Sequence, residues 1–283
     1  GVSYSQQSNE VAAWCGPLLQ DGDSRKSGMQ IYHRREWDPQ AGKRIGAEAV
    51  EKAVELLKAS PISGGKLPVV LDEYMAPRFL GMFFGAFSAE SAQRGMSRLQ
   101  GRLGETIAIP ELTLLDDPHR QGANRSCFLD AEGFLTKPLP LIEEGVFRNF
   151  LYHVESANKE NKSSTGHAVR GYSGGIGTRS HNLVWPTGEF SLEQLCAQNS
   201  KCLLVTQLEG QAGCNPVSGD ISIGVQGFLI ENGLRIQPVD SITLAGNFFD
   251  VMLNIRGSGN TYQPELTHSF IPALLIEGLT VSG

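Results

Sequence analysis

Short apolar runs broken by glycine-containing turns dominate the second half of the chain. Strand-like segments cover residues 202–208, 221–230 and 235–239, and Asn232-Gly233 between the last two is a strong hairpin signal. The 33 glycines, many beside Asp, Asn, Ser or Glu, supply further turns of this kind. This pattern predicts an α+β fold whose C-terminal part is a large antiparallel sheet or open barrel with a few helices. Further strands are predicted at 67–72, 111–115, 127–129, 134–135, 139–142, 146–153, 181–186 and 273–281.

The first 60 residues have a different pattern, which is typical of the tail of an α/β domain. Strands are predicted at 11–15 and 29–33, with turns between them, and residues 45–59 place apolar side chains at helical spacing. Ser, Pro and Gly residues follow this helix and mark the best boundary in the chain. We therefore predict two parts, residues 1–60 and residues 61–283.

Three further segments carry specific expectations. Residues 74–93 are predicted to form one helix with Pro77 in its first turn. Its cluster of Met82, Phe83, Phe84 and Phe87 is assigned to the core, with a ligand pocket as the alternative. Residues 191–197 are predicted to form a short helix capped by Ser191, and 246–255 another helix. Residues 155–180, polar and rich in Ser and Gly, are predicted to be a long loop. Such a loop either lines a functional site or is exposed to solvent and partly disordered.

Composition and charge exclude several classes of protein. The formal net charge is −6 and the cations are scattered, so we expect no nucleic-acid partner. The longest apolar run, 79–87, is far shorter than the roughly 20 residues of a membrane span, so we expect no membrane partner. The five cysteines form no CxxC pair, which is typical of reduced thiols in a cytoplasmic protein. Because the chain starts with Gly1-Val2 rather than with Met, we expect upstream sequence to be missing.

The residues themselves show no complete active site. No two of the six histidines are spaced as HxH, HxxH or HxxxH, so the sequence contains no local two-histidine metal clamp. A metal site built from distant residues such as His167 or His268 stays open. Asp116 and Asp117 are adjacent in a predicted strand, so they point to opposite faces and make a poor acid–base pair. Cys214 is a conceivable nucleophile without a histidine at fixed spacing.

A series of motifs nonetheless resembles the C-terminal domain of the TldD/PmbA family. The motifs are LPVVLD, GRLGE and LLDDP within 66–118, LIEEGV, STG at 164–166, GCNPVSGDISIGVQGFLIENG at 213–233, PVDSITLAGNFFDVMLNI at 238–255 and ALLIEGLTVSG at 273–283. They occur in order over about three quarters of the chain. The resemblance implies that residues 61–283 are this domain, that residues 1–60 are a remnant of the region preceding it, and that the family's N-terminal domain is missing.

The family has two arms, and the chain departs from one of them. The resemblance implies, for the TldD arm, a zinc peptidase with an HExxxH motif on the helix after the LPVVLD-like strand and a further Cys ligand near the C-terminus. Two histidines four residues apart can hold one zinc ion, with the Glu acting as a base on bound water. The corresponding helix here contains no His, and no Cys follows Cys214. The chain therefore resembles the PmbA, or TldE, arm, which lacks the zinc ligands.

This resemblance implies a non-catalytic subunit that pairs with a TldD-like, zinc-containing subunit and has no cofactor of its own. The pair would degrade or mature unfolded peptides such as microcin precursors and antitoxins, the link behind the name "modulator of DNA gyrase". The alternatives are a metallopeptidase in its own right with a non-local metal site, and a peptide-binding or regulatory homodimer. No catalytic or metal-ligating residue is assigned. The candidate peptide-chamber residues are Ser88, Glu90, Arg170, Asn215 and Asp220.

Overall fold

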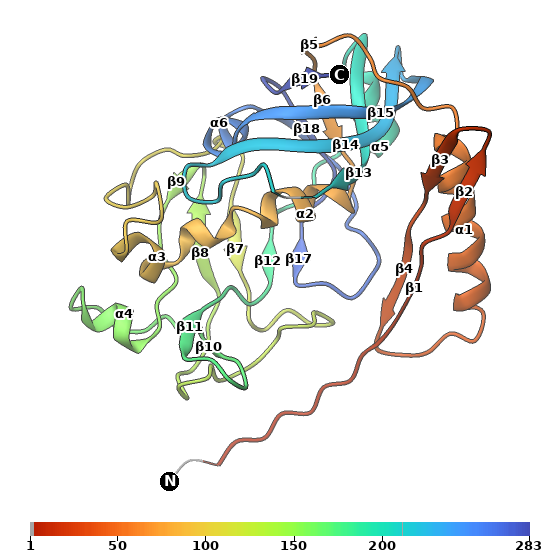
Figure 1. Ribbon diagram of the computed structural model, residues 1–283. Coiled ribbons are helices and arrows are strands. Elements are labelled where there is room, and N and C mark those ends of the chain that lie inside the picture. Colours follow the sequence, from red (N-terminus) through yellow and green to blue (C-terminus); the bar gives the residue numbers. More distant parts are fainter. Residues whose placement is uncertain (1–2, 211) are drawn as a thin grey trace.

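The computed structural model describes residues 3–210 and 212–283, which form two sheets with helices between and beside them (Figure 1). The larger sheet has eight strands in the order β16-β18-β6-β13-β14-β15-β19-β5. All its pairings are antiparallel except β6–β13. The strands are β5 Gly65–Lys66, β6 Val69–Leu71, β13 Lys201–Glu209, β14 Asp220–Glu231, β15 Leu234–Asn247, β16 Ile255–Ser258, β18 Leu274–Ile276 and β19 Thr280–Ser282.

The smaller sheet has five short strands in the order β17-β12-β7-β8-β9. Its members are β7 Leu114–Asp116, β8 Leu139–Glu143, β9 Val146–Phe147, β12 Leu183–Val184 and β17 Ser269–Phe270. Three two-stranded ribbons complete the strands: β1 Val11–Cys15 with β4 Gln30–Arg34, β2 Leu18–Asp21 with β3 Ser24–Ser27, and β10 Ala168–Arg170 with β11 Ile176–Thr178. The α+β fold with a large, mainly antiparallel sheet and few helices is therefore confirmed.

The helices among the described residues are short except for α1. They are α1 Ala41–Leu56, α2 Met75–Gly81, α3 Ala89–Gln93, α4 Val154–Asn158, α5 Leu192–Ala197 and α6 Phe248–Leu253, with a 3₁₀ turn, η1, at Phe84–Phe87. The Ser191 cap of α5 is confirmed, because its hydroxyl accepts from the Gln194 amide while the Gln194 side chain accepts from the Ser191 amide. Within the described residues no helix has the length and apolar content that crossing a bilayer requires.

The single helix predicted over 74–93 is wrong. The segment breaks into α2, η1 and α3, since the backbone around Ser88 pairs with another segment instead of continuing the helix. The amide of Leu151 donates to the carbonyl of Phe87, and the amide of Ala89 donates to the carbonyl of Leu151. Ser88 adopts an extended conformation there and its hydroxyl caps α3. A tertiary pairing therefore overrides a continuous helical pattern.

Four other local predictions also need correction. The strands predicted at 127–129 and 134–135 are reduced to one isolated bridge between Leu129 and Leu135. Residues 155–180 are not a long loop, because they contain most of α4 and the ribbon β10–β11. The turns predicted between 20 and 28 include the paired strands β2 and β3. The strand predicted over 273–281 is two strands, since Gly278 turns the chain with φ +86° and sends β19 to the far side of the sheet beside β15.

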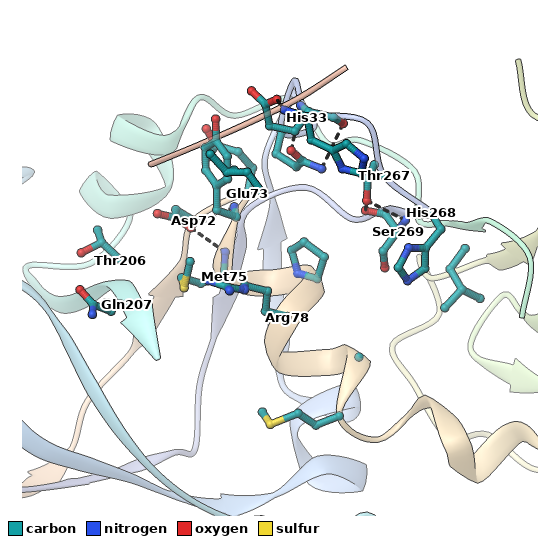
Figure 2. Close-up of a pocket in the computed structure, with 18 of the residues that line it drawn as sticks. His33, Asp72, Glu73, Met75, Arg78, Thr206, Gln207, Thr267, His268 and Ser269 are labelled. Atoms are coloured by element: carbon teal, nitrogen blue, oxygen red, sulfur yellow. Dashed lines mark hydrogen bonds between the residues drawn. The ribbon is translucent and has the colours of Figure 1, made fainter. Parts of the chain in front are cut away.

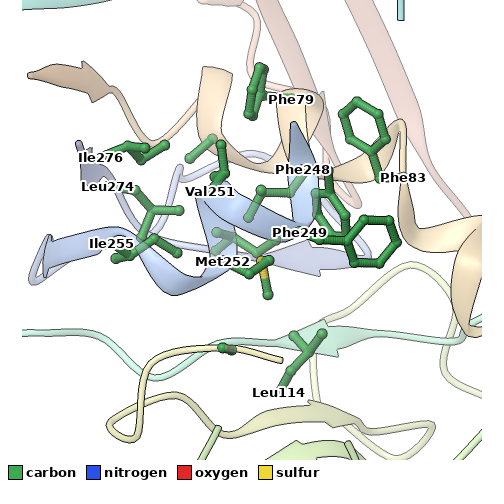
Figure 3. Packing of buried hydrophobic residues seen from close by; sticks show 14 of the residues in the cluster. Phe79, Phe83, Leu114, Phe248, Phe249, Val251, Met252, Ile255, Leu274 and Ile276 are labelled. Carbon is green, nitrogen blue, oxygen red and sulfur yellow. The ribbon is translucent and has the colours of Figure 1, made fainter. Parts of the chain in front are cut away.

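The main core lies between the two sheets and is rich in aromatic side chains. Phe79 and Phe83 from the α2 segment are fully buried, and the ring of Phe83 stacks on that of Phe248 from α6 with centroids 4.9 Å apart. Figure 3 shows the α6 side chains packed against Phe79 and Phe83 on one side and facing Leu114 of β7 on the other. The assignment to the core is thus confirmed for Phe83 and Phe87, whereas Met82 and Phe84 are only partly buried and line the cavity described below. The packing of Phe79 and Phe83 fixes α2 against the large sheet.

The N-terminal ribbons and α1 pack beside the large sheet (Figure 1). Lys26 of β3 forms an ion pair with Asp240 of β15, and both side chains are largely buried. At the other end, the amide of Leu266 donates to the carbonyl of His33, and Arg34 pairs with Glu265 at 2.9 Å. These contacts hold the β1–β4 ribbon across a gap from α2, and that gap is the site described next.

Candidate functional site

A cavity of about 1150 Å³ lies between the N-terminal ribbon, α2 and the large sheet. Trp14 and Ile31 of the β1–β4 ribbon form part of one wall, and both are exposed, at 72% and 39%. These two residues are directly opposite in the ribbon, so they present one apolar surface to the cavity. The other face of the ribbon carries Tyr32, which is buried against α1. A mostly apolar cavity with polar groups at its ends is the usual form of a binding site.

Asp72 lies where β6 ends and α2 begins, on the lining of this cavity (Figure 2). Its Oδ1 accepts from the amides of Tyr74, at 3.0 Å, and Met75, at 2.7 Å, so the carboxylate caps the first turn of α2. Burial raises the pKa of Asp72 to about 6, with Glu73 adding to the effect and Lys52 opposing it. Asp72 therefore holds a proton more readily than an exposed aspartate.

The α2–η1 segment forms the wall at which the family resemblance places a zinc-binding helix. Its cavity-lining residues are Met75, Pro77, Arg78, Gly81, Met82, Phe84 and Gly85. None of these side chains is a zinc ligand of the usual imidazole, thiolate or carboxylate type. Among residues 3–210 and 212–283, no group of three or more His, Cys, Asp or Glu is placed to hold a metal ion. The side chains present on this wall therefore do not fit a zinc ion.

The other end of the cavity is basic. Arg125 and Arg179 line it together with His268. Burial, and then the charge of Arg179, lower the pKa of Arg125 to about 10. Burial, followed by the charges of both arginines, lowers the pKa of His268 to about 4, so this imidazole is neutral at pH 7. In Figure 2, His268 and Ser269 lie on one side of α2 and Asp72 and Thr206 on the other.

A buried polar network lies beneath the basic end. Asp116 has no solvent exposure, and its Oδ2 accepts from His167 Nε2 and from the His181 amide, each at 2.9 Å. His181 Nε2 lies 2.8 Å from the carbonyl of Gly166, so Nε2 carries the proton and Nδ1 is an acceptor. The Cys127 thiol, 3.4 Å from that Nδ1, is the donor. Burial raises the pKa of Cys127, so the sulfur stays protonated and this network is structural.

The five candidate chamber residues are not brought together. Ser88 lines the cavity, where its hydroxyl also accepts from the Ser91 amide at 3.4 Å. Glu90, on α3, pairs with Arg94 at 2.5 Å, and Arg170 ends β10; neither lines the cavity. Asn215 and Asp220 are in contact with each other, since the Asn215 amide donates to the Asp220 carbonyl at 2.8 Å. They form a turn beside α6, also outside the lining.

Sequence reasoning missed Asp72 and Arg125 as cavity residues, whereas Arg179 lies within residues 155–180, for which lining a functional site was one of two expectations. A signal existed for Asp72, because an acidic residue directly after a fully apolar strand and before a helix combines a cap with burial. No local signal existed for Arg125, since 55 positions separate it from Ser180, whose carbonyl it contacts. Asp117 caps a turn, because its Oδ1 accepts from the His119 amide at 2.9 Å. All five cysteines are free, as predicted.

Comparison with known proteins places this geometry in a family. A family model described as the PmbA/TldA metallopeptidase C-terminal domain matches residues 64–283. The chain is 32% identical to the metalloprotease PmbA of Escherichia coli O157:H7 over 87% of its own length and 52% of that protein. It is 32% identical to the PmbA homolog of Haemophilus influenzae over its whole length and 61% of that protein.

Two solved structures have the same fold. A Thermotoga maritima protein named as a candidate modulator of DNA gyrase superimposes with a TM-score of 0.87 at 31% identity, over 96% of this chain and 62% of that one. TldE of Thermococcus kodakarensis superimposes with a TM-score of 0.82 at 25% identity, over 97% and 63%. The chain thus spans between half and two thirds of the length of these relatives. On the family match and these identities, the chain belongs to the PmbA/TldD family of metallopeptidases.

Proposed function

We propose that this chain is a PmbA/TldE-like subunit that holds extended, unfolded peptide in the cavity but has no catalytic residues of its own. Hydrolysis would be carried out by a TldD-like partner, and zinc would be bound there. Ser88, at the base of the α2–η1 wall, is the one sequence-predicted chamber residue that we retain for peptide contact. We expect the pair to be cytoplasmic and to act on peptides such as microcin precursors and antitoxins.

The observation that carries this proposal is the chemistry of the α2–η1 wall. Where a zinc peptidase of this family requires histidines, the wall offers Gly81, Gly85, Arg78 and apolar side chains to the cavity. These residues leave room for a polypeptide backbone and supply no metal ligand of the usual kind, and the carboxylate of Asp72 at the start of α2 is engaged by two backbone amides. The wall is therefore suited to contact with a peptide rather than to its cleavage.

The β1–β4 ribbon supports the peptide part of the proposal. Among the described residues β1 pairs with β4 alone, so its second edge is open to a further strand. A peptide added at such an edge is held by main-chain hydrogen bonds, and these depend little on its sequence. The exposed Trp14 on β1 and Ile31 opposite it on β4 provide apolar surface for side chains of the peptide.

The test is peptidase activity on an unfolded peptide, together with zinc content, for this chain alone and for this chain mixed with a TldD-like protein. We expect activity and near-stoichiometric zinc only in the mixture, and loss of activity on adding a chelator. Native mass spectrometry of the same samples should show a complex of the two chains.

Two results would overturn the proposal. Zinc-dependent hydrolysis by this chain alone would indicate a metal site of its own, built from groups far apart in the sequence. A stable homodimer that binds peptide and ignores the TldD-like protein would indicate an independent binding or regulatory protein. In both cases binding of a peptide to this chain can be measured without the TldD-like protein, so peptide binding and complex formation are tested separately.

A further inference from the structure

Three chain segments far apart in the sequence converge at the basic end of the cavity. The amide of Asn124 donates to the carbonyl of Thr267, and the amide of Leu183 donates to the carbonyl of His268. Arg125 Nη1 lies 3.5 Å from the carbonyl of Ser180. These links hold the segments that carry Arg125, Arg179 and His268 in one place on the cavity wall.

Both arginines lack a carboxylate partner. In the described part of the chain, neither guanidinium forms an ion pair with an Asp or Glu, although ion pairs engage Arg34, Arg44, Arg94, Arg102, Arg148, Arg235 and Arg256. Arg125 is partly buried, and its guanidinium has one long contact with a carbonyl. Asp116 is the nearby carboxylate and its charge acts on Arg125, but it has no solvent exposure and forms no ion pair with either arginine. Its Oδ2 accepts from His167 and the His181 amide, and its Oδ1 has no hydrogen-bond partner. Two neighbouring cations on a cavity wall with no carboxylate in ion-pair contact favour an anion there.

The rest of the end wall has groups that suit a planar, two-oxygen anion. Ser180 and Ser269 add hydroxyl groups, and the neutral imidazole of His268 can donate one hydrogen bond. The hydroxyls of Thr178 and Thr267 also line the cavity but contact His153 and the backbone of Ser269. Guanidinium groups bind carboxylates through paired N–H donors. Resting on the proposed peptide-binding function, we propose that Arg125, Arg179 and His268 form a subsite for a carboxylate group of the bound peptide.

The carboxylate can come from the C-terminus of the peptide or from an Asp or Glu side chain. The experiment therefore uses three fluorescently labelled, unstructured peptides: one with a free C-terminal carboxylate and no acidic side chain, its C-terminal amide, and an amide with one internal Glu. Fluorescence anisotropy gives the Kd of each for the 283-residue chain at low and at high salt. The variants are the double substitution Arg125→Gln/Arg179→Gln and, as matched control, Arg170→Gln, which lies at the end of β10 and outside the cavity lining.

We expect the wild-type chain to bind at least one of the two carboxylate-bearing peptides about tenfold or more tightly than the plain amide, because charged hydrogen bonds are strong in a partly buried site. High salt should reduce this ratio. The double variant should bind all three peptides alike, and Arg170→Gln should retain the wild-type ratio. Tighter binding of the free-acid peptide identifies the C-terminus as the source of the bound carboxylate. Tighter binding of the amide with an internal Glu identifies the Glu side chain as that source.

Equal binding of all three peptides by the wild-type chain would overturn the subsite while leaving the peptide-binding proposal in place. Binding of none of them would overturn both. Persistence of the acid preference in a folded double variant, checked by circular dichroism, would also overturn the assignment to these arginines. The comparison of acid with amide on the wild-type chain remains decisive if the double variant does not fold.

Discussion

At the scale of single residues, Asp72 and Asp116 are two buried carboxylates with different roles. Asp72 accepts from two backbone amides at the start of α2 and faces the cavity, where burial raises its pKa to about 6. Asp116 accepts from an imidazole and an amide inside the smaller sheet. Ionisation of Asp72 is therefore opposed by the loss of hydration on burial. Asp116 instead joins three segments of the fold through its hydrogen bonds.

Replacing Asp72 with Asn should stabilise the protein at pH 8. The amide oxygen of Asn keeps the cap on α2, while the buried charge is removed. A folded-state pKa above the unfolded value gives stability that is present below about pH 4 and is lost as pH rises through about 6. We expect Asp72→Asn to raise the free energy of unfolding by about 1–3 kcal/mol at pH 8 and by much less at pH 4.5. Urea denaturation at both pH values checks this, and a variant less stable than wild type at pH 8 would contradict it.

Replacing Asp116 with Ala should destabilise the protein strongly. The change leaves the His167 imidazole and the His181 amide buried without their acceptor. We expect a loss of about 3 kcal/mol or more in the free energy of unfolding. The adjacent Asp117→Ala is the matched control, since it removes a cap on the partly exposed turn at His119 and should cost about 1 kcal/mol. Similar losses for the two variants would show that the buried network is not the cause.

At the scale of elements, close approach of backbones decides what a position tolerates. Gly227 lies at a β-bulge of β14, where a Cβ atom would meet the carbonyl oxygen of Leu204 on β13 at 1.9 Å. Gly46 lies within α1, where nothing is within 4 Å of an added Cβ. One glycine is therefore required by packing of the large sheet, and the other only weakens a helix.

This contrast gives a paired prediction for two Gly→Ala changes. Gly227→Ala should lower the free energy of unfolding by about 3 kcal/mol, because two paired strands must separate to admit a methyl group. Gly46→Ala should raise it by about 0.5–1 kcal/mol, since alanine restricts the unfolded chain and favours the helix. Thermal unfolding of both variants measures the two effects. A neutral Gly227→Ala would mean that β13 and β14 are less closely packed there.

At the scale of the whole molecule, the cavity exists because the N-terminal ribbons are held against the large sheet. The Lys26–Asp240 ion pair joins β3 to β15, with side-chain exposures of 15% and 7%. The Arg235–Glu55 pair joins α1 to the same strand but is about half exposed. Of the two, the buried pair should matter more for keeping the ribbons in place, because exposed pairs contribute little.

Asp240→Ala should therefore loosen the N-terminal part selectively. Leaving Lys26 buried without a partner costs about 3–5 kcal/mol, and that cost is relieved if β2, β3 and α1 move away from the sheet. Hydrogen exchange should become at least about tenfold faster in residues 18–56 while the centre of β13–β15 stays protected. Glu55→Ala is the control and should change exchange little. Uniformly faster exchange throughout the chain would indicate global destabilisation instead.

The sequence by itself determined the elements whose signals are local. The hairpin at Asn232-Gly233 formed because both positions require positive φ, at 50° and 78°, and the sequence supplies residues that adopt it. The cap of α5 and the apolar stretch at 79–87 followed in the same way from neighbouring residues. The ordered motifs also determined the family, since they extend over most of the matched domain.

Only the tertiary structure decided the rest. The helix over 74–93 is broken because Leu151, far along the chain, pairs with the backbone at Phe87 and Ala89. The basic end of the cavity combines Arg125 with Arg179, and the Asp116–His167 contact joins residues 51 positions apart. Hydrophobic periodicity specifies which face of an element is buried, but not which distant element covers it. Strand order and register determine which element covers each buried face. They therefore also determine where the cavity lies and which charged side chains face it.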